Sequence, residues 1–277
     1  QDPGALIRLR EEAAMQLVDA HCHFDFPFFD GHREAVLAQA ASLGVRAIVI
    51  PGVRRQDWQR VASMADAEKG LWYCLGIHPW FIQEHGAGDL AELERLLSSA
   101  PQASVGLGEC GLDALKGDLS EQEPWFEAQI DIAQRLGLAL VIHSVKSHDL
   151  VHSSLKRAGW NGRALLHGFS GSYQQAQKLV DLGCYIGVGG VITHDRARKT
   201  RDTIARLPAD ALVLETDAPD MAPAGVAKGQ NSPVHLPEIF EALAELRSEP
   251  RESLAEILLA NTAKLYRKDP LTLVPRP

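Results

Sequence analysis

The stretch "LVDAHCH", residues 17–23, is a short apolar run that ends in two histidines separated by one residue. A short apolar run with branched residues predicts a buried β-strand. Runs of the same kind return along the whole chain, and each is followed by a longer amphipathic stretch. The eight runs are LVDAHCH (17–23), RAIVIPG (46–52), LWYCLGIHP (71–79), SVGLGECGLD (104–113), LALVIHS (138–144), RALLHGFSG (163–171), CYIGVGG (184–190) and ALVLETDAP (211–219).

The intervening stretches carry helix signals. Residues 33–43 have apolar side chains at helical spacing and stop at Gly44, and Ser120–Glu123 predicts a capping box before a helix to about Leu136. Further helices are expected over 148–158, 173–182, 236–247 and 251–265.

Apolar strands that alternate with helices predict an α/β protein whose parallel sheet is covered by helices. Eight such units predict a single (β/α)8 barrel. A doubly wound sheet is the alternative, but no G-x-G-x-x-G turn follows the first run.

Composition sets the remaining limits. The chain has 277 residues, of which 45% are apolar, and we expect one barrel domain over 15–277. Residues 1–14 lack the apolar core of a signal peptide, so we expect a disordered leader or a cloning remnant there. No stretch is apolar enough to span a membrane. The net charge of −8 gives no global attraction to nucleic acid, although a local basic patch is compatible with it.

The four cysteines lie within or at the end of apolar runs and show no zinc-finger spacing. We expect buried, reduced thiols in a cytoplasmic protein. They are Cys22, Cys74, Cys110 and Cys184.

Polar and ionisable residues gather at the carboxyl ends of the apolar runs. Frayed strand ends would carry Lys, Ser and Asn as often as His, yet five of the eleven histidines lie there. Barrel enzymes build their active sites at this face from the ends of several strands. The residues are His21, His23, His78, Glu109, His143, His167, Glu215 and Asp217.

Imidazole and carboxylate together suit Zn, Mn, Fe or Co, and carboxylate-rich sites also accept Mg. Two ions about 3.5–4 Å apart would share a water molecule and lower its pKa, and Asp217 would be placed to accept the proton. The first ion would take His21, His23, Glu109 and Asp217, and the second would take Glu109, His143 and His167, with Glu109 as the bridge.

Asp19 and two of the strand-end residues, Glu215 and His78, have two interpretations each. Asp19 shares the alternating face of the first two histidines, so it either orients one of them by a hydrogen bond or caps the strand end. Glu215 has the same two interpretations. His78 precedes Pro79 and either contacts substrate or orders the loop. Most of the other histidines are expected at the surface, namely His32, His85, His148, His152, His194 and His235.

One dense basic segment, "HDRARKTR" (194–201), follows the seventh run. Phosphate sites of barrels often lie after strands 7 and 8, so Arg196, Arg198 and Lys199 are candidate phosphate contacts. The alternative is an ordinary solvated helix start. Trp80 and Phe81 either stack a base or pack against the helix layer.

Taken together, the motifs resemble one known family. In order, "DAHCHFD", "LGIHPW", "GLGECGLD", "VIHS", "LHGFSGS", "IGVGG", "LVLETDAPD" and "NSP" are similar to the TatD-type metal-dependent hydrolases, which belong to the amidohydrolase-like barrels. The resemblance runs from about Leu17 to Tyr266.

The resemblance implies a slightly distorted (β/α)8 barrel of the metallo-dependent hydrolase type in the cytoplasm. It implies divalent metals, for which we expect two ions drawn from Zn, Mn, Mg, Co or Ni. It implies phosphodiester hydrolysis, typically as a deoxyribonuclease. The ligands that it implies are those already singled out at the strand ends: His21, His23, Glu109, His143, His167 and Asp217.

The chain also departs from the family pattern. Val145 stands where the family commonly has an arginine, and Lys146 beside it is a candidate substrate contact that lacks the bidentate geometry of arginine. Cys110 replaces a usual aliphatic residue. The segments after the seventh and eighth runs look closer to an uncharacterised bacterial subgroup than to the founding nuclease.

Three functions follow as hypotheses. The first is hydrolysis of DNA or of a small phosphoester, with Asp217 and Glu109 as catalytic residues, by a monomer without membrane or obligate protein partners. The second is an amidohydrolase acting on amides or lactones; such enzymes often use a carboxylated lysine from strand 4, where this chain has Glu109. The third, a catalytically silent metal-binding protein, is disfavoured by the intact Asp217.

Overall fold

The computed structural model describes residues 15–99 and 101–270, in which eight strands form one parallel sheet in the order β1 to β8. Strand order in space therefore equals strand order in sequence, as the barrel prediction requires. The strands are β1 (Leu17–Asp19), β2 (Val45–Pro51), β3 (Leu71–Leu75), β4 (Ser104–Asp113), β5 (Ala139–Val145), β6 (Ala164–Leu166), β7 (Cys184–Val188) and β8 (Leu212–Leu214).

Backbone hydrogen bonds just beyond the two outermost strands bring the sheet round on itself. The Ala20 N–H donates to the Leu214 carbonyl at 3.0 Å, and the Asp217 N–H donates to the His21 carbonyl at 2.8 Å. The (β/α)8 barrel prediction is confirmed.

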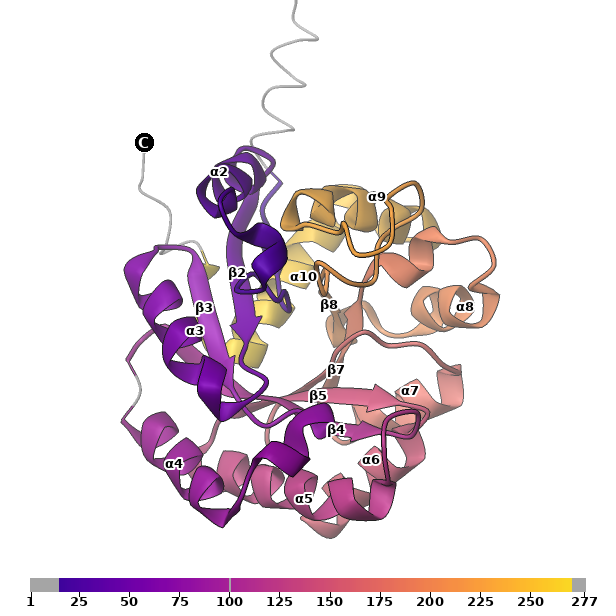
Figure 1. The fold of residues 1–277 in the computed structure, drawn as a ribbon. Helices are drawn as coiled ribbons and strands as arrows, with labels where there is room; N and C mark the ends of the chain where they lie inside the picture. The colour runs from indigo at the N-terminus through magenta and orange to yellow at the C-terminus, as the bar shows by residue number, and fades with distance from the viewer. Residues whose placement is uncertain (1–14, 100, 271–277) are drawn as a thin grey trace, which may run out of the picture.

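Helices surround the strands as an outer ring (Figure 1). They are α2 (Arg33–Ser42), α3 (Arg55–Ala67), α4 (Ala87–Ser98), α5 (Leu119–Leu136), α6 (His148–Arg157), α7 (Tyr173–Asp181), α8 (Arg198–Arg206), α9 (Leu236–Leu246) and α10 (Arg251–Tyr266). Short 3-10 turns interrupt the loops: η1 (Pro27–Phe29), η2 (Pro79–Glu84), η3 (Gly190–Thr193), η4 (Ala209–Ala211) and η5 (Pro233–His235).

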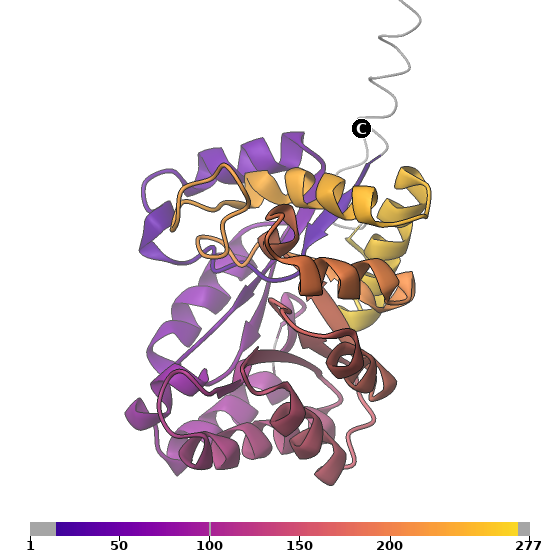
Figure 2. The ribbon, with the colours of Figure 1, turned by 90° about the vertical axis from the view of Figure 1, so that its right-hand side faces the viewer.

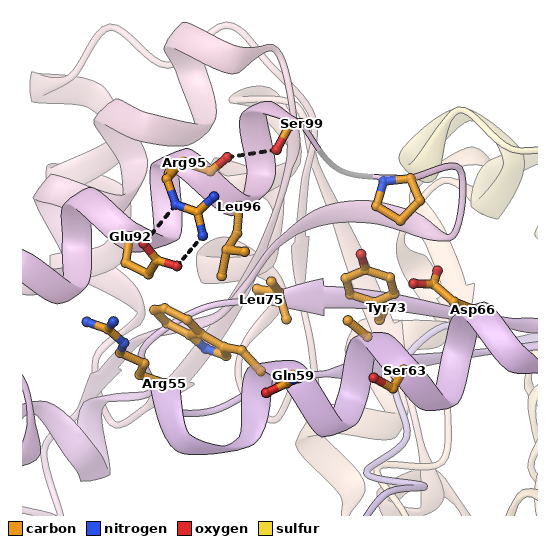
Figure 3. A pocket seen from close by; sticks show the side chains of 13 residues that line it. Arg55, Gln59, Ser63, Asp66, Tyr73, Leu75, Glu92, Arg95, Leu96 and Ser99 are labelled. Carbon is orange, nitrogen blue, oxygen red and sulfur yellow. Dashed lines mark hydrogen bonds and ion pairs between the residues drawn. The ribbon is translucent and has the colours of Figure 1, made fainter.

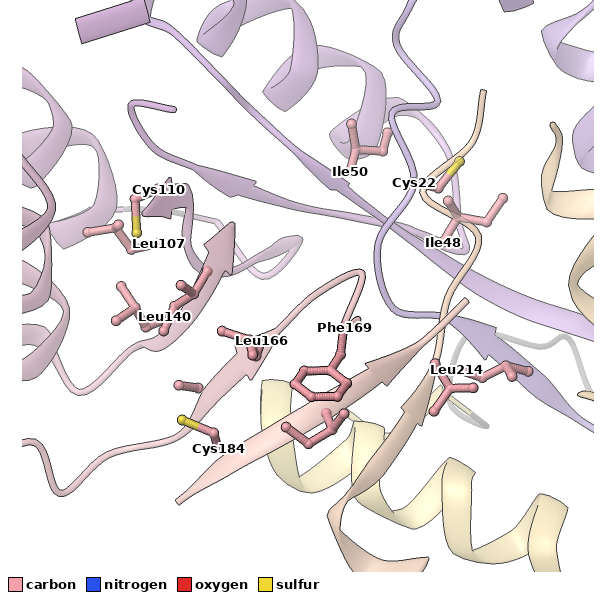
Figure 4. Packing of buried hydrophobic residues seen from close by; sticks show 14 of the residues in the cluster. Cys22, Ile48, Ile50, Leu107, Cys110, Leu140, Leu166, Phe169, Cys184 and Leu214 are labelled. Carbon is pink, nitrogen blue, oxygen red and sulfur yellow. The ribbon is translucent and has the colours of Figure 1, made fainter. Parts of the chain in front are cut away.

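Alternation along the strands separates two apolar cores. In β5, Leu140 and Ile142 belong to the cluster that packs against the helices, whereas Ala139 and Val141 belong to the cluster inside the barrel. Figure 4 shows part of the outer cluster, including Leu140. By the same alternation, His143 follows Val141 onto the interior face.

The C-terminal helix α10 covers the end of the barrel where the strands begin. Leu265 and Tyr266 join the interior cluster, the Tyr266 hydroxyl donates to the Ala20 carbonyl at 2.8 Å, and the Asn261 amide donates to the Leu212 carbonyl. Figure 2 shows this yellow helix beside the indigo first strand. With that end covered, polar residues at the opposite strand ends face the open side.

One helix start differs from the prediction. Asp118, rather than Ser120, is the N-cap of α5, because its carboxylate accepts a hydrogen bond from the Ser120 backbone N–H at 2.8 Å. An aspartate two residues earlier competes with serine for the same free N–H groups. The predicted end is confirmed, since Gly137 takes the left-handed conformation at the C-cap.

The outer wall has a pocket of about 540 Å³ between α3 and α4, lined by Trp58, Tyr73 and Leu96 among others (Figure 3). It contains none of the predicted site residues. The expected leader, residues 1–14, lies outside the described residues, so the domain boundary stays a prediction. Within residues 15–99 and 101–270, no helix combines the length and apolarity needed to cross a membrane.

Candidate metal centre

Glu109 lies at the middle of the open end of the barrel, on β4, and is buried with 1% of its surface exposed. Its two carboxylate oxygens face different groups of histidines. Oε1 lies 3.2 Å from His21 Nε2 and 3.3 Å from His23 Nε2. Oε2 lies 2.7 Å from His167 Nε2 and 3.0 Å from His143 Nδ1. One carboxylate thus joins two clusters of nitrogen ligands.

Asp217 completes the first cluster. Its Oδ1 lies 3.2 Å from His21 Nε2 and 3.3 Å from His23 Nε2, so both rings face both carboxylates. Asp217 has a φ of 56°, which aspartate tolerates better than most residues. The hydrogen bond from its own N–H to the His21 carbonyl fixes this conformation. The predicted set His21, His23, Glu109 and Asp217 therefore lies together.

His78 lies in the second cluster rather than at its edge. Its Nε2 is 3.1 Å from Glu109 Oε2, and its ring centroid is 4.4 Å from that of His143. The backbone N–H of Trp80 donates to the other ring nitrogen, His78 Nδ1, at 3.1 Å. His78 thus forms one group of candidate ligands with Glu109 and His143, and its substrate-contact and loop-ordering roles stay predictions.

Asp113 is a site residue that the sequence reasoning missed. Its Oδ2 accepts hydrogen bonds of 2.8 Å from both His143 Nε2 and the Trp80 indole N–H. Although burial opposes it, these bonds lower the pKa of Asp113 to about 2. Its position four residues after Glu109, on the same strand face as Gly111, was the signal in "GECGLD".

Glu215 also comes closer to the histidines than expected. Its carboxylate forms a group with His21 and His167 whose ligand atoms all lie within 4.8 Å of one another. Oε1 accepts a short hydrogen bond from the Gly168 N–H. Gly187 on β7 leaves the room for this carboxylate, since a Cβ there would lie 2.6 Å from Oε1.

Asp19 does not share one face with the two histidines, contrary to the alternation argument. Regular strand ends at Asp19, and beyond it Ala20 packs inside the barrel while Cys22 packs in the outer cluster. Asp19 instead accepts hydrogen bonds from Thr216 Oγ1 at 2.6 Å and from the His21 backbone N–H at 3.3 Å. It holds the main chain on both sides of the first cluster, and no bond to an imidazole ring is among its hydrogen bonds in the described chain.

Comparison with known proteins settles the family. The family model described as TatD related DNase matches residues 18–267. The chain belongs to the TatD family of metal-dependent hydrolases. It is 42% identical to the uncharacterized metal-dependent hydrolase YjjV of Escherichia coli K12, over 91% of this chain and 98% of that protein. It is 32% identical to the 3'-5' ssDNA/RNA exonuclease TatD of Klebsiella pneumoniae, over 87% and 94% of the two chains.

A solved structure agrees with both the family and the barrel. The crystal structure of the E. coli TatD homologue YjjV superimposes with a TM-score of 0.87, covering 92% of this chain and 99% of that one at 42% identity. The resemblance to the TatD family that the sequence motifs predicted is therefore confirmed.

The electrostatics of this TatD-family site fit a bound cation. Burial alone would lower the pKa of His21, yet the carboxylates of Glu109 and Asp217 raise it well above its ordinary value. Burial also acts to lower the pKa of His23, but the carboxylates of Asp217 and Glu109 outweigh it and raise this pKa to about 9. Buried negative charge here draws protons onto imidazole, and a divalent cation held by the same groups would replace those protons.

Two other groups show the effect of burial directly. Burial lowers the pKa of His167 to about 4, so this imidazole is neutral at pH 7 and its nitrogen can act as a ligand. Burial raises the pKa of Glu215 to about 8, although the nearby His21 opposes the rise.

Several buried ligand atoms of the centre also lack ordinary partners. Buried polar atoms are nearly always hydrogen-bonded, so such a group is informative. Within the described residues, no hydrogen bond of normal geometry reaches His21 Nε2, Glu109 Oε1, Asp217 Oδ1 or Glu215 Oε2. These donors and acceptors converge without satisfying one another, as the residues around a cation do, and we conclude that the residues fit a metal.

A groove of about 460 Å³ adjoins the second cluster. Lys146 and Lys199 line it together with Ser144 and Gly168, which directly follow the ligand-like His143 and His167. Arg196 and Arg198 are exposed, but neither is among the residues described as lining this groove.

His148 lies in the same groove and differs from its expected surface position. Its two ring nitrogens bond to Ser144 Oγ and to the Ser170 carbonyl, both at 2.8 Å, and its side chain is buried. The sequence around His148 shows only that it begins a helix. Its burial depends on Ser144 and Ser170, which lie on other segments of the chain.

Proposed function

We propose that this protein is a divalent-metal-dependent phosphodiesterase that cleaves nucleic acid, with single-stranded DNA as its main substrate. The observation that carries the proposal is the Glu109 carboxylate, whose two oxygens face separate histidine clusters at 2.7–3.3 Å. A shared carboxylate between two nitrogen-rich clusters is the arrangement that two-metal hydrolases use. The relative named as a 3'-5' ssDNA/RNA exonuclease supports the choice of substrate.

The proposal places two ions at the centre, drawn from Zn, Mn, Mg, Co or Ni. One would be held by His21, His23, Glu109 and Asp217, and the other by Glu109, His143 and His167, with His78 and Glu215 close enough to contribute. When bound, divalent ions would activate a water molecule and neutralise charge on the phosphate oxygens.

The residues themselves have distinct tasks in this proposal. Asp217 would accept the proton of the attacking water, because its Oδ1 lies at the first cluster, 3.2 Å from His21 Nε2, and receives no hydrogen bond of normal geometry from the described residues. Glu109 fixes the spacing of the two clusters. Asp19 and Thr216 hold the two main-chain segments that carry His21 and Asp217 at a constant separation.

Substrate phosphates adjoining the cleaved bond would lie in the groove beside the second cluster. Lys146 and Lys199 supply its positive charge, and Val145 supplies no donor there. Point charges of this kind bind phosphate without reading the base. Arg196 and Arg198 would contact more distant phosphates, since they lie just before and at the start of α8.

The experiment is a hydrolysis panel on metal-free protein reconstituted with each of the five ions in turn. The substrates are single-stranded DNA, duplex DNA, RNA, small phosphoesters and a lactone. Glu109→Gln is the test variant, and Glu34→Gln on the exposed face of α2 is its matched control. We expect cleavage of single-stranded DNA that only Glu109→Gln abolishes. Hydrolysis of the lactone without any phosphodiester cleavage would replace the proposal with the amidohydrolase alternative.

Four free cysteines, all buried, support a reducing compartment, and we infer that the protein acts in the cytoplasm. A monomer remains the prediction from the sequence, and light scattering of the metal-loaded protein tests it.

A further inference from the structure

Trp80 is an exposed aromatic side chain at the rim of the metal centre, and the proposed chemistry gives it no task. Half of its surface, 50%, is exposed, whereas Trp58, Trp72 and Trp160 are buried. The neighbouring Phe81 does not share this exposure, because the Arg54 guanidinium lies 4.7 Å from its ring centroid and it is half-buried. Leaving a large ring in water is costly, so its position needs a reason.

The ring is held in one orientation close to the histidines. Its indole N–H donates to Asp113 Oδ2 at 2.8 Å, and Asp113 is itself buried and bonded to His143. The Trp80 centroid lies 4.9 Å from that of His78 and 5.9 Å from that of His143, with interplanar angles of 72° and 76°. The indole therefore stands steeply against both imidazole rings, at the edge of the second cluster.

The loop after β4 extends the same surface. Leu115 is 67% exposed, and its backbone N–H donates to the other Asp113 oxygen at 2.9 Å. The exposed Lys116 places its Nζ 5.3 Å from the Trp80 centroid. The buried Asp113 carboxylate thus fixes the exposed Trp80 ring and the backbone of the exposed Leu115, and the Lys116 ammonium group lies beside them.

We propose that Trp80 is a stacking platform for an unpaired nucleobase next to the cleaved phosphate, with Leu115 at its edge and Lys116 on the neighbouring phosphate. The inference rests on the proposed function and gives a physical reason for its preference for single strands. Every base presents a π-face, so the platform accepts all four bases. In a duplex the partner strand and the adjacent bases already occupy the faces and edges of each base, so paired DNA does not reach the ring.

The test uses the full chain loaded with its active metal and two oligonucleotides. One is oligothymidylate, and the other has the same backbone with base-free tetrahydrofuran residues at the end that is cleaved. The variants are Trp80→Ala and Trp80→Phe, and the readouts are kcat and KM. We expect Trp80→Ala to raise KM for oligothymidylate about 5- to 150-fold, the usual range for one lost base stack. We expect Trp80→Phe to recover most of the loss.

The base-free oligonucleotide separates stacking from support of Asp113. All three proteins should cleave it with similar constants, because it offers nothing to stack. Trp80→Ala could instead lower kcat by the same factor on both oligonucleotides. That result would show that Trp80 acts only through its hydrogen bond to Asp113, and it would overturn the stacking proposal.

A second readout does not depend on activity. Oligothymidylate is titrated into the protein in EDTA, and tryptophan emission is followed. We expect quenching that is much weaker in Trp80→Phe and with the base-free strand. If the wild-type protein cleaves no phosphodiester at all, the proposed function fails while this titration still decides the platform. Emission unchanged by oligothymidylate would reject it.

Discussion

Asp113 and His143 are joined by a 2.8 Å hydrogen bond at His143 Nε2, while His143 Nδ1 faces Glu109. An ionised carboxylate only accepts, so Nε2 carries a proton. The carboxylates of Asp113 and Glu109 together raise the pKa of His143 to about 9, and a metal ion bound at the second cluster would replace the proton on Nδ1. A carboxylate behind a ligand histidine fixes its tautomer and raises its basicity. Asp113 is therefore a positioning residue for the second cluster.

We expect Asp113→Asn to weaken metal binding or activity about 10- to 100-fold, the usual cost of removing such a partner. Titration of metal ions into the metal-free protein, followed by calorimetry, measures the affinity of each metal-binding step. We expect the loss of affinity in the weaker step. Asp118→Asn is the matched control, because it changes a nearby exposed aspartate and keeps a good N-cap for α5. Equal metal affinities in Asp113→Asn and wild type would contradict the positioning role.

The carboxyl group of Glu215 occupies the space that a side chain at Gly187 on β7 would need. A Cβ at Gly187 would lie 2.6–2.7 Å from all three atoms of the Glu215 carboxyl group. Because the clash is with the end of a flexible side chain, we expect Gly187→Ala to fold, at a cost of about 1–3 kcal/mol in unfolding free energy. We expect the displaced carboxylate to reduce metal content and activity.

Metal analysis after dialysis, together with denaturant unfolding, separates the two effects. Gly88→Ala in α4 is the control, since a Cβ there meets no atom within 4 Å and alanine favours the helix. Unchanged metal content in Gly187→Ala would mean that Glu215 has no part in binding metal.

The sequence was sufficient to predict the barrel and the two clusters because both depend on strand ends. The residues of β5 before His143 form a continuous apolar run, and strand alternation together with closure of the barrel brings His143 to the common face. Glu109 could be placed for the same reason. These inferences need only the period of the strand and the direction of the chain.

Other features depend on contacts between distant segments. Asp19 bonds Thr216, which is 197 residues away, and no local pattern distinguishes this role from capping a strand end. Asn231 lies in a loop, yet its buried amide donates to the carbonyls of Thr216 and Asp220 and so holds the segment that carries Asp217. Such partners become visible only when the loops are placed in three dimensions.

The cysteines give a prediction about reactivity. All four are buried, and burial raises the pKa of Cys184 to about 12, so its thiolate is scarce at neutral pH. We expect no more than slow modification of the native protein by a thiol reagent at pH 7, and four rapidly reacting thiols after denaturation. A single fast-reacting thiol in the folded protein would show that one of these sites opens.

Lys146 lines the groove from the loop after β5 and Lys199 from the first turn of α8, and their contribution is testable through salt. If each contacts one phosphate, Lys146→Ala and Lys199→Ala should each weaken binding of single-stranded DNA and reduce the slope of log affinity against log salt by about 0.7. Hydrolysis of a small phosphoester should stay unchanged, because it does not extend into the groove. Lys178→Ala on the exposed face of α7 is the matched control. A salt slope that neither groove variant changes would place the phosphate track elsewhere on the barrel face, with Arg196 and Arg198 as the next residues to substitute.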